Sequence, residues 1–181
     1  PRANNDLERV IHAVKPTVLI GTTGQPGTFT EPIIRAAAKH AARPVVMPFS
    51  NPTSKCEAKP VDVIKWTDGQ ALIASGSPFD PVEHNGRTIQ ISQGNNVYIF
   101  PGVGLGALVS GAREVTDSMF TVAAEVLAGC VEPHDLACGR LYPPLDELRD
   151  ISRKIAIAVA LEAVAAKVTD HDIGPAEAEK R

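Results

Sequence analysis

The chain has 181 residues, a formal net charge of −3 and 44% hydrophobic residues, which is the composition of an ordinary globular domain with a real core. Because only 4% of the residues are aromatic and lysine and arginine form no basic stripe, we expect no nucleic-acid partner. Three cysteines without Cys-x-x-Cys spacing fit a reducing compartment better than a disulfide framework or a zinc site, and no apolar run reaches the ~18 residues of a membrane span.

The first residues, Pro-Arg-Ala-Asn-Asn, resemble neither a translation start nor a signal peptide. A helical pattern follows almost at once, with apolar residues at positions 7, 10, 11 and 14, and predicts a short amphipathic helix. We therefore expect the chain to be a piece of a longer protein.

The first half of the chain alternates apolar runs with glycine-rich or polar loops. The runs predict strands buried on both faces of a parallel sheet, at residues 17–20, 45–47 and 71–75. Helices at residues 31–40, with Thr30 as the N-cap, and at residues 60–66 would supply the right-handed crossovers. A sheet of this kind carries its site at the carboxyl ends of the strands.

The second half of the chain is predicted to be mostly helical after a small hairpin. An Asn-Gly turn at 85–86 precedes a short edge strand at 88–91. Asp117 is the predicted N-cap of a helix that Gly129 closes. The helix predicted at 144–167 is apolar nearly all round in its second half, so we expect it to pack on the sheet and on a partner outside this chain.

Polar loops follow the predicted strands and contain the candidate site residues. The turn from Gly21 to Gly27 follows the first strand, and its backbone amides suit an anion or a cofactor. Ser50-Asn51-Pro52 fits either a simple Asx turn or an amide held rigidly at the active edge. Asn95-Asn96 after Gly94 fits a turn as well, but paired neutral amides also suit a carboxylate or carboxamide ligand.

A second glycine cluster, Gly102-x-Gly104-x-x-Ala107, matches the dinucleotide-binding pattern G-x-G-x-x-A and follows residues 97–100, which fit a strand. Pro101 interrupts the junction between that strand and the turn. We therefore favour glycines that let a helix pack closely over glycines that hold a pyrophosphate.

Neither a catalytic nor a metal-binding set is visible in the sequence. The five histidines have no ligand spacing, and the acids Asp80, Glu83 and Asp117 have no nearby carboxylate partner, so no paired-acid mechanism or metal site can be built from them. Cys56 lies in a predicted loop, but a reactive cysteine needs a lowered thiol pKa.

Five motifs follow one another in a set order: Lys-Pro-Thr-Val-Leu-Ile-Gly at 15–21, Phe-Thr-Glu at 29–31, Pro-Phe-Ser-Asn-Pro-Thr-Ser-Lys at 48–55, Ala-Ser-Gly-Ser-Pro-Phe-Asp-Pro at 74–81, and Gln-Gly-Asn-Asn-Val-Tyr-Ile-Phe-Pro-Gly-Val-Gly-Leu-Gly at 93–106. Together, over residues 15–166, they resemble malic enzymes. The stretch is similar to the C-terminal part of the NAD(P)-binding domain of the large-subunit malic enzymes of bacteria and eukaryotes.

The resemblance implies a Rossmann-like, three-layer α/β/α fold with a mostly parallel sheet, of which this chain would hold the C-terminal half and the C-terminal helices. It implies oxidative decarboxylation of malate to pyruvate and CO₂ with NAD or NADP and with Mg²⁺ or Mn²⁺. It places Asn51, Asn95 and Asn96 at malate. The cofactor contacts that it implies are Gly21, Thr22, Thr23, Gly24, Ser50, Asn51 and Asn95.

The family's catalytic tyrosine and lysine, substrate arginine, metal-binding acids and true dinucleotide fingerprint lie N-terminal to the matching stretch. We therefore expect no catalytic or metal-binding residue in this chain and no activity from it alone. Residues 1–168 would be the NAD(P)-binding segment, and residues 169–181 a polar, mobile tail. The alternative is a non-catalytic module for cofactor binding or oligomerisation.

The expected partners are malate or pyruvate, the missing N-terminal part of the protein and further copies in a homo-oligomer. Self-association would involve Ile157, Leu161 and Val164 on the predicted long helix. We expect a bacterial cytoplasmic location, with the mitochondrial matrix as the alternative.

Overall fold

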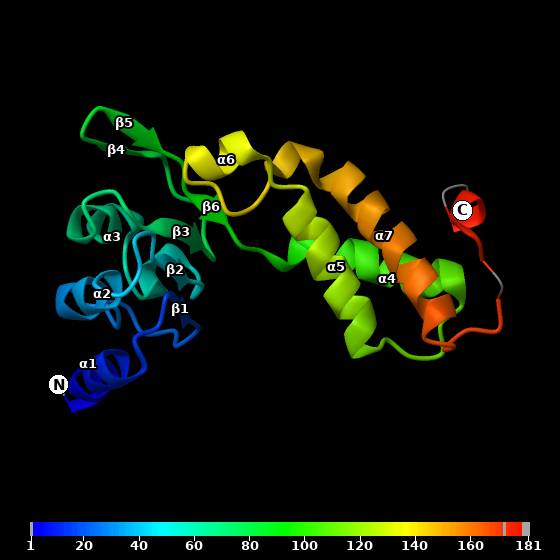
Figure 1. Cartoon of the computed structure of the whole chain (residues 1–181), viewed down its shortest axis with the longest axis horizontal. Coiled ribbons are helices and arrows are strands. Elements are labelled where there is room, and N and C mark those ends of the chain that lie inside the picture. Colours follow the sequence, from blue (N-terminus) through cyan, green and yellow to red (C-terminus); the bar gives the residue numbers. More distant parts are fainter. Residues whose placement is uncertain (1, 172, 179–181) are drawn as a thin grey trace. The chain divides into compact units, whose positions relative to one another are not determined.

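The structure is a computed structural model that describes residues 2–171 and 173–178, and it divides into two compact units (Figure 1). Unit 1 contains the described residues up to Gly94 together with Pro133–Tyr142. Unit 2 contains Asn95–Glu132 and the described residues from Pro143 onward. The division falls inside the Gly-Asn-Asn motif, so the candidate site residues belong to both units.

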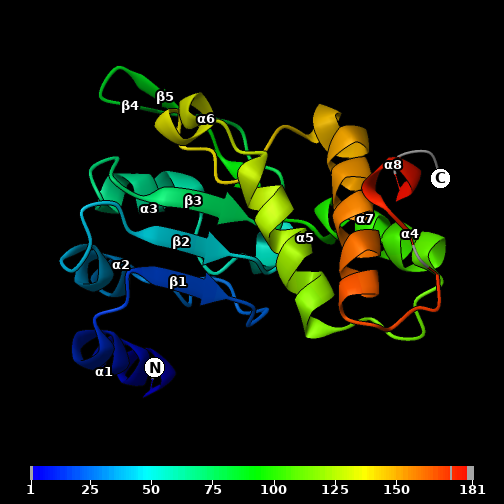
Figure 2. The ribbon, with the colours of Figure 1, turned by 45° about the vertical axis from the view of Figure 1, so that its right-hand side comes forward.

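Unit 1 is built on a parallel sheet with the strand order β1-β2-β3-β6. Its strands are β1 (Val18–Gly21), β2 (Val45–Pro48), β3 (Leu72–Ser75) and β6 (Ser92–Gln93). Figure 2 shows β1, β2 and β3 side by side and pointing the same way. The predicted α/β class and the first three strands are confirmed, whereas β6 is too short to give a sequence pattern.

Helices α1 (Arg2–Val14), α2 (Glu31–Ala38) and α3 (Pro60–Trp66) form the core of unit 1 together with the sheet. Residues of this core include Ile11, Leu19, Ile33, Val46, Ile64 and Ile73. The helix predicted at 60–66 is confirmed. Thr30 occupies the predicted N-cap position of α2 in an extended conformation, but its side chain makes no capping hydrogen bond.

Strand β1 is buried on one face only, which corrects the prediction of a strand buried on both faces. Leu19 is 8% exposed, whereas Val18 and Ile20 are 45% and 61% exposed. β1 lies at the edge of the sheet, and only its Leu19 side chain joins the core with the helices. A short run of β-branched residues does not distinguish a strand buried on both faces from an edge strand buried on one face.

The predicted Asn85-Gly86 turn joins β4 (Val82–His84) to β5 (Arg87–Ile89) in an antiparallel hairpin of unit 1.

The chain returns to unit 1 after the first helices of unit 2. Beyond α6 (Pro133–Ala137), the Leu141 amide donates to Ser92 Oγ at 2.7 Å, and the Arg43 guanidinium donates to the Leu136 carbonyl at 3.1 Å. The segment 133–142 is therefore fastened to the sheet.

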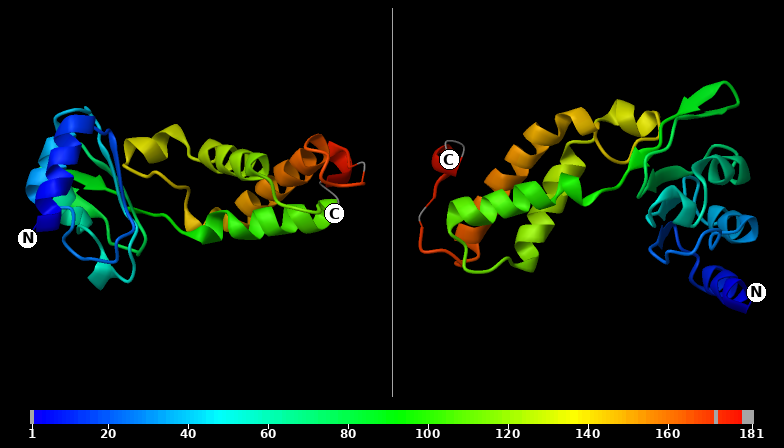
Figure 3. Two further views of the ribbon diagram at one scale, coloured as in Figure 1. Left: turned by 90° about the horizontal axis from the view of Figure 1, so that it is seen from below. Right: turned by 180° about the vertical axis from the view of Figure 1, so that it is seen from behind.

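Unit 2 is helical and has α7 (Leu148–Ala165) at its centre, packed on α4 (Phe100–Ser110) and α5 (Asp117–Gly129). The two views of Figure 3 show α4 running beside α7. Short helices η2 (Asn96–Tyr98), η3 (Leu145–Glu147) and α8 (Pro175–Ala178) complete it. Within unit 2, α4 and α5 pack against this helix, and its expected packing on the sheet stays a prediction.

Two other predictions for unit 2 are corrected. Residues 97–100 form the end of η2 and the start of α4 rather than a strand, since Asn95 and Pro101 both favour the start of a helical turn. The N-cap of α5 is Thr116, whose Oγ1 accepts from the Met119 amide at 3.3 Å, and Gly129 is the last residue within the helix. Asp117 takes the first helical position, which also suits an acid.

Glycines let α4 approach α7 closely. A Cβ on Gly102 would lie 2.6 Å from Ile155 Cβ, and a Cβ on Gly106 would lie 2.7 Å from the Ala156 carbonyl oxygen. A Cβ on Gly104 would have no atom within 4 Å. Because no strand precedes the cluster and two of its glycines face α7, the helix-packing interpretation is confirmed.

The exposed apolar side chains of unit 2 lie on α4 and α5 more than on α7. Phe100 and Leu108 are 75% and 81% exposed, whereas Ile157 and Leu161 of the predicted association face are half-buried. Among the described residues, no helix has both the length and the apolar character needed to cross a membrane.

Part of the predicted mobile tail is packed within unit 2. Ile173 is 3% exposed, and the Thr169 hydroxyl donates to the Ser110 carbonyl. Positions 172 and 179–181 of that tail lie outside the described residues.

Candidate functional site

The loop after β1 presents bare backbone to solvent. Thr22, Thr23 and Gly24 are exposed, while Gly21 is buried at the end of the strand. Gly24 and Gly27 have φ angles of +67° and +72°, and a Cβ on either would have no atom within 4 Å. Such a loop allows close approach of a flat ligand to the backbone at the carboxyl edge of the sheet, which fits a nicotinamide cofactor.

The loop after β2 is hydrogen-bonded to the loop after β1. The Gly24 amide donates to Ser50 Oγ at 2.8 Å. Ser50 is 8% exposed, so its hydroxyl acts between the two loops rather than in solvent. The structure therefore brings together Gly21, Gly24 and Ser50, which are predicted cofactor residues.

A buried carboxylate, Glu57, lies beneath these loops and has no exposed surface. Its Oε1 accepts from the Thr23 amide at 2.7 Å, from the Thr23 hydroxyl at 2.9 Å and from the Ser50 hydroxyl. Its Oε2 accepts from the Ser50 amide at 3.2 Å. Both oxygens are thus satisfied by donors from two different loops, as a buried charge requires.

Glu57 is the residue that sequence reasoning missed. It stands in the buried run Cys56-Glu57-Ala58, directly after an exposed stretch at 51–55. A single glutamate beyond a polar loop gives no pattern that separates it from an ordinary solvated acid. The only hint is its place between two small apolar residues.

Hydrogen bonding keeps Glu57 ionised in spite of its burial. Burial alone would raise the pKa of Glu57, but the hydrogen bonds from Ser50 and Thr23 outweigh it and hold the pKa below the ordinary value. Burial raises the pKa of the neighbouring Cys56 thiol, whose Sγ donates to the Ala58 carbonyl at 3.0 Å. Cys56 is therefore a neutral structural thiol rather than a reactive one.

The lowered pKa of Glu57 predicts a loss of stability in acid. Since the folded-state pKa lies below the unfolded one, the stabilisation is complete above the unfolded pKa and is lost as pH falls through the folded pKa. Each pKa unit of lowering corresponds to about 1.4 kcal/mol. Urea unfolding of the chain, measured at neutral pH and in steps below the ordinary glutamate pKa, should show this loss.

Glu57→Gln is the control for the acid measurement. The amide cannot titrate, so the variant should be less stable at neutral pH and lose less on acidification. Identical acid profiles for the two proteins would show that other carboxylates cause the loss.

Asn51 directly follows Ser50 in the loop after β2. It is exposed, its peptide bond to Pro52 is cis, and its side-chain amide makes no hydrogen bond within residues 2–171 and 173–178. A neutral amide with both donors and its acceptor available suits a carboxylate or carboxamide group. Its predicted contact with malate and cofactor stays a prediction.

The Gly94-Asn95-Asn96 segment is not the predicted tight turn. Gly94 continues from β6, where its amide donates to the Ser75 carbonyl at 2.9 Å, and a Cβ on it would lie 2.5 Å from the Phe49 ring. Asn95 is extended, with φ −141° and ψ 144°. Glycine is needed here for space beside an aromatic ring, not for a left-handed conformation.

In unit 2, the two asparagines of the motif have different surroundings. Asn95 caps η2, because its Oδ1 accepts from the Val97 amide at 3.0 Å. Asn96 is exposed, and its side chain makes no hydrogen bond within the part of the chain that the structure describes. Asn95 therefore has a structural role already, whereas Asn96 has an amide available for a ligand.

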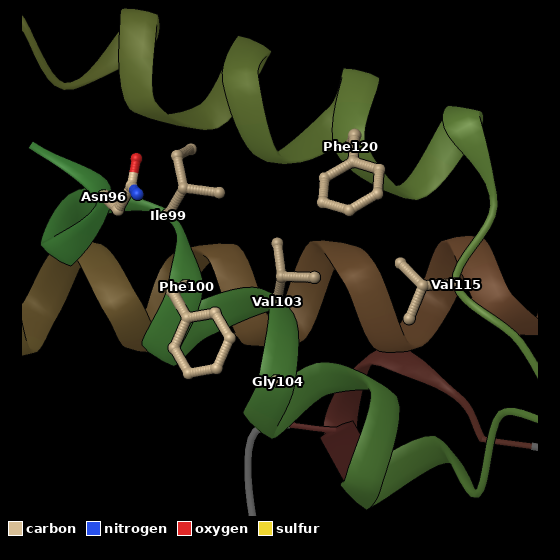
Figure 4. Close-up of a pocket in the computed structure, with 7 residues that line it drawn as sticks. All are labelled: Asn96, Ile99, Phe100, Val103, Gly104, Val115 and Phe120. Carbon is tan, nitrogen blue, oxygen red and sulfur yellow. The ribbon is translucent and has the colours of Figure 1, made fainter.

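Asn96 stands at one end of an apolar pocket of about 350 Å³ in unit 2 (Figure 4). The other lining residues are Ile99, Phe100, Val103, Gly104, Val115 and Phe120. In Figure 4 the Ile99, Val103 and Phe120 side chains lie between α4 and α5. The amide is the polar group of an otherwise hydrophobic surface.

The described residues offer no fit for the metal that the resemblance implies. Among them, no group of three or more His, Cys, Asp or Glu side chains is placed to hold a metal ion. The three cysteines are free, as expected. We therefore derive no chemical step through Mg²⁺ or Mn²⁺ from this chain.

Comparison with known proteins identifies the family. Residues 2–164 match the family described as malic enzyme, NAD binding domain. The NAD-dependent malic enzyme of Aliivibrio salmonicida is 50% identical over 171 residues, which cover 92% of this chain and 30% of that protein. The NAD-dependent malic enzyme of Photorhabdus laumondii is 53% identical over 163 residues, which cover 88% of this chain and 29% of that protein.

Solved structures agree with the sequence matches. The crystal structure of the Entamoeba histolytica malic enzyme aligns with a TM-score of 0.74 at 28% identity, covering 92% of this chain and 31% of that one. The malic enzyme of Pyrococcus horikoshii aligns with a TM-score of 0.71 at 29% identity, covering 91% of this chain and 34% of that one. The chain thus spans about 30% of the length of the curated relatives that it matches. On this basis the chain belongs to the malic enzyme family and corresponds to its NAD-binding domain.

Proposed function

We propose that this domain forms the nicotinamide side of an NAD-dependent malic enzyme that converts malate and NAD⁺ to pyruvate, CO₂ and NADH. The observation that carries the proposal is the exposed backbone loop at 21–24, held by hydrogen bonds to Ser50 at the carboxyl edge of a parallel sheet. The curated relatives at about 50% identity are named NAD-dependent malic enzymes, which favours NAD over NADP.

The residues of this domain would bind and orient rather than transfer protons. NAD⁺, when bound, supplies the hydride acceptor. Thr22 would offer its hydroxyl to the nicotinamide side of the cofactor, and Thr22, Thr23 and Gly24 would offer backbone carbonyls, since the Thr23 and Gly24 amides already donate to Glu57 and Ser50. Asn51 and Asn96 would each donate amide hydrogens to malate. Asn95 would fix the backbone around Asn96, because its Oδ1 accepts from the Val97 amide at the start of η2.

The proton chemistry is assigned to residues outside this domain. The resemblance places the family's tyrosine, lysine and metal-binding acids N-terminal to the matching stretch. We propose that Mg²⁺ or Mn²⁺ is held there, where it would polarise the carbonyl formed at C2 of malate. A bacterial cytoplasmic location is proposed by analogy with the bacterial relatives.

An activity assay tests the proposal. The complete enzyme that contains this domain, supplied with malate, NAD⁺ and Mg²⁺ or Mn²⁺, should produce NADH, CO₂ and pyruvate in equal amounts. The 181 residues alone should produce none. A complete enzyme without malate-dependent NADH formation would refute the proposed function.

NAD⁺ binding by the complete enzyme, compared with its turnover of malate, discriminates this proposal from a purely non-catalytic module. If the complete enzyme binds NAD⁺ by calorimetry but does not turn over malate under any of these conditions, the module interpretation is the correct one. Light scattering of the same samples reports the homo-oligomer that we propose for the complete enzyme.

A further inference from the structure

Glu57 joins the two loops that carry most of the proposed cofactor residues. Four hydrogen bonds to its carboxylate come from Thr23 and Ser50, which follow β1 and β2. Ser50 extends the connection, because its hydroxyl donates to Glu57 and accepts from the Gly24 amide. A single buried carboxylate therefore holds Thr23 and Ser50 directly, and Gly24 through Ser50.

Gly21 leaves the space that the Glu57 side chain occupies. A Cβ on Gly21 would lie 2.8 Å from both Glu57 Cγ and Cδ, and 2.9 Å from the Phe29 ring. Gly21 needs no left-handed conformation, so the space for Glu57 is the reason for glycine at this position. The Phe29 amide also donates to the Glu57 carbonyl at 3.1 Å, which fixes the glutamate backbone to the segment just before α2.

Glu57 cannot touch a ligand itself, because none of its surface is exposed. Its effect must pass through the residues that it holds. Ser50 directly precedes the exposed Asn51, and Thr23 and Gly24 are exposed on the loop after β1. The position of all these groups depends on whether the carboxylate accepts its hydrogen bonds.

We propose that Glu57 is a positioning residue of the site: its buried carboxylate ties the 21–24 loop to Ser50 and thereby sets where Gly24 and Asn51 stand for the cofactor and substrate. The inference rests on the proposed malic enzyme function for its kinetic consequence. The clamp itself, meaning the Glu57 hydrogen bonds to Thr23 and Ser50, is measurable without any ligand.

Glu57→Gln is the first test, since it keeps the shape of the side chain. Each carboxylate oxygen accepts from at least one backbone amide, so the amide nitrogen of glutamine would face a donor in either orientation. Hydrogen exchange of the chain should become at least tenfold faster at the Thr23, Gly24 and Ser50 amides. Amides in α2 and β3 should speed up less than these three amides, and only by the loss of overall stability.

Asp135→Asn is the matched control. Asp135 is another buried carboxylate of unit 1, 3% exposed and paired with Arg140 at 3.1 Å, but it touches neither loop. The Asp135→Asn variant should leave hydrogen exchange at the Thr23 and Gly24 amides unchanged. Equal acceleration in both variants would mean a general loss of stability and would overturn the proposal.

Kinetics of the complete enzyme give the second readout. Glu57→Gln should raise the KM for NAD at least tenfold, while Asp135→Asn stays within twofold of the wild type. A KM within twofold of the wild type for Glu57→Gln would overturn the proposal.

Ser50→Ala keeps the clamp testable if Glu57→Gln does not fold. Loss of the hydroxyl should also speed exchange at the Thr23 amide, which Ser50 does not contact but which shares Glu57 as its acceptor. Unchanged exchange at Thr23 would overturn the clamp. If the wild-type enzyme shows no malate-dependent activity, the proposed function fails, while the exchange data still decide whether Glu57 holds the two loops.

Discussion

Gly106→Ala is expected to cost unit 2 about 1–3 kcal/mol or more of stability. The new methyl group would lie 2.7 Å from the Ala156 carbonyl oxygen and from Val159 Cβ on α7. A backbone carbonyl within a helix cannot rotate aside, so α4 and α7 must move apart. Urea unfolding followed by circular dichroism measures the loss, because unit 2 is helical.

Gly104→Ala is the matched control on the same helix. Its methyl group would have no atom within 4 Å, and alanine is the better helix former by about 1 kcal/mol. Gly104→Ala should therefore be neutral or stabilising. Fluorescence of Trp66, the single tryptophan, reports unit 1 separately. Equal stability of the two variants would contradict the close helix packing.

Asn51→Ala and Asn96→Ala are each expected to lower kcat/KM for malate roughly 10- to 100-fold in the complete enzyme, the effect of losing one hydrogen bond to a charged ligand. Both amides are exposed and make no hydrogen bond within the described ranges. Their removal should therefore change stability by no more than about 0.5 kcal/mol. Steady-state kinetics with malate varied at saturating NAD measure the effect.

Gln70→Ala is the control for an exposed amide away from the proposed site, since Gln70 precedes β3 at the amino edge of the sheet. It should match the wild type in both kinetics and stability. Unchanged kinetics in Asn51→Ala and Asn96→Ala would remove these residues from the substrate site. A loss of stability equal to the loss of activity would mean that the amides support the fold instead.

The strands and helices of unit 1 could be predicted because each has a local signal. Val45–Met47 is a compact apolar run, and Pro60 favours the first turn of the helix that ends at Trp66. The exposed face of β1 had no such signal. Whether Ile20 is covered depends on which elements pack against the strand, and a run of four residues does not encode that.

The errors in unit 2 arise from competition between neighbouring signals. Thr116 and Asp117 are both good N-caps, and the hydrogen bond of Thr116 to the Met119 amide decides between them. Residues 97–100 have the composition of a strand, but the Asn95 cap and the proline at 101 start helical turns there.

Residues of the candidate site could be proposed from the sequence where they directly follow a predicted strand, and not where their role depends on contacts that only the fold creates. Ser50 and Gly24 could be proposed from their places after predicted strands. Glu57 could not, because its importance lies in contacts with Thr23 and Ser50, which are 34 and 7 positions away along the chain. Only the fold brings those donors to one carboxylate.

The return of residues 133–142 to the sheet has a consequence for how the chain is made. Gln90 donates its amide to the Cys138 carbonyl, and Arg43 donates to Leu136, which lies 93 positions later. Because a ribosome delivers the chain from its N-terminus, unit 1 cannot be completed until the helices between residues 95 and 132 have already emerged. The edge formed by β6 must wait for its last segment, and during that interval α4 and α5 are present before α7, the helix that covers them.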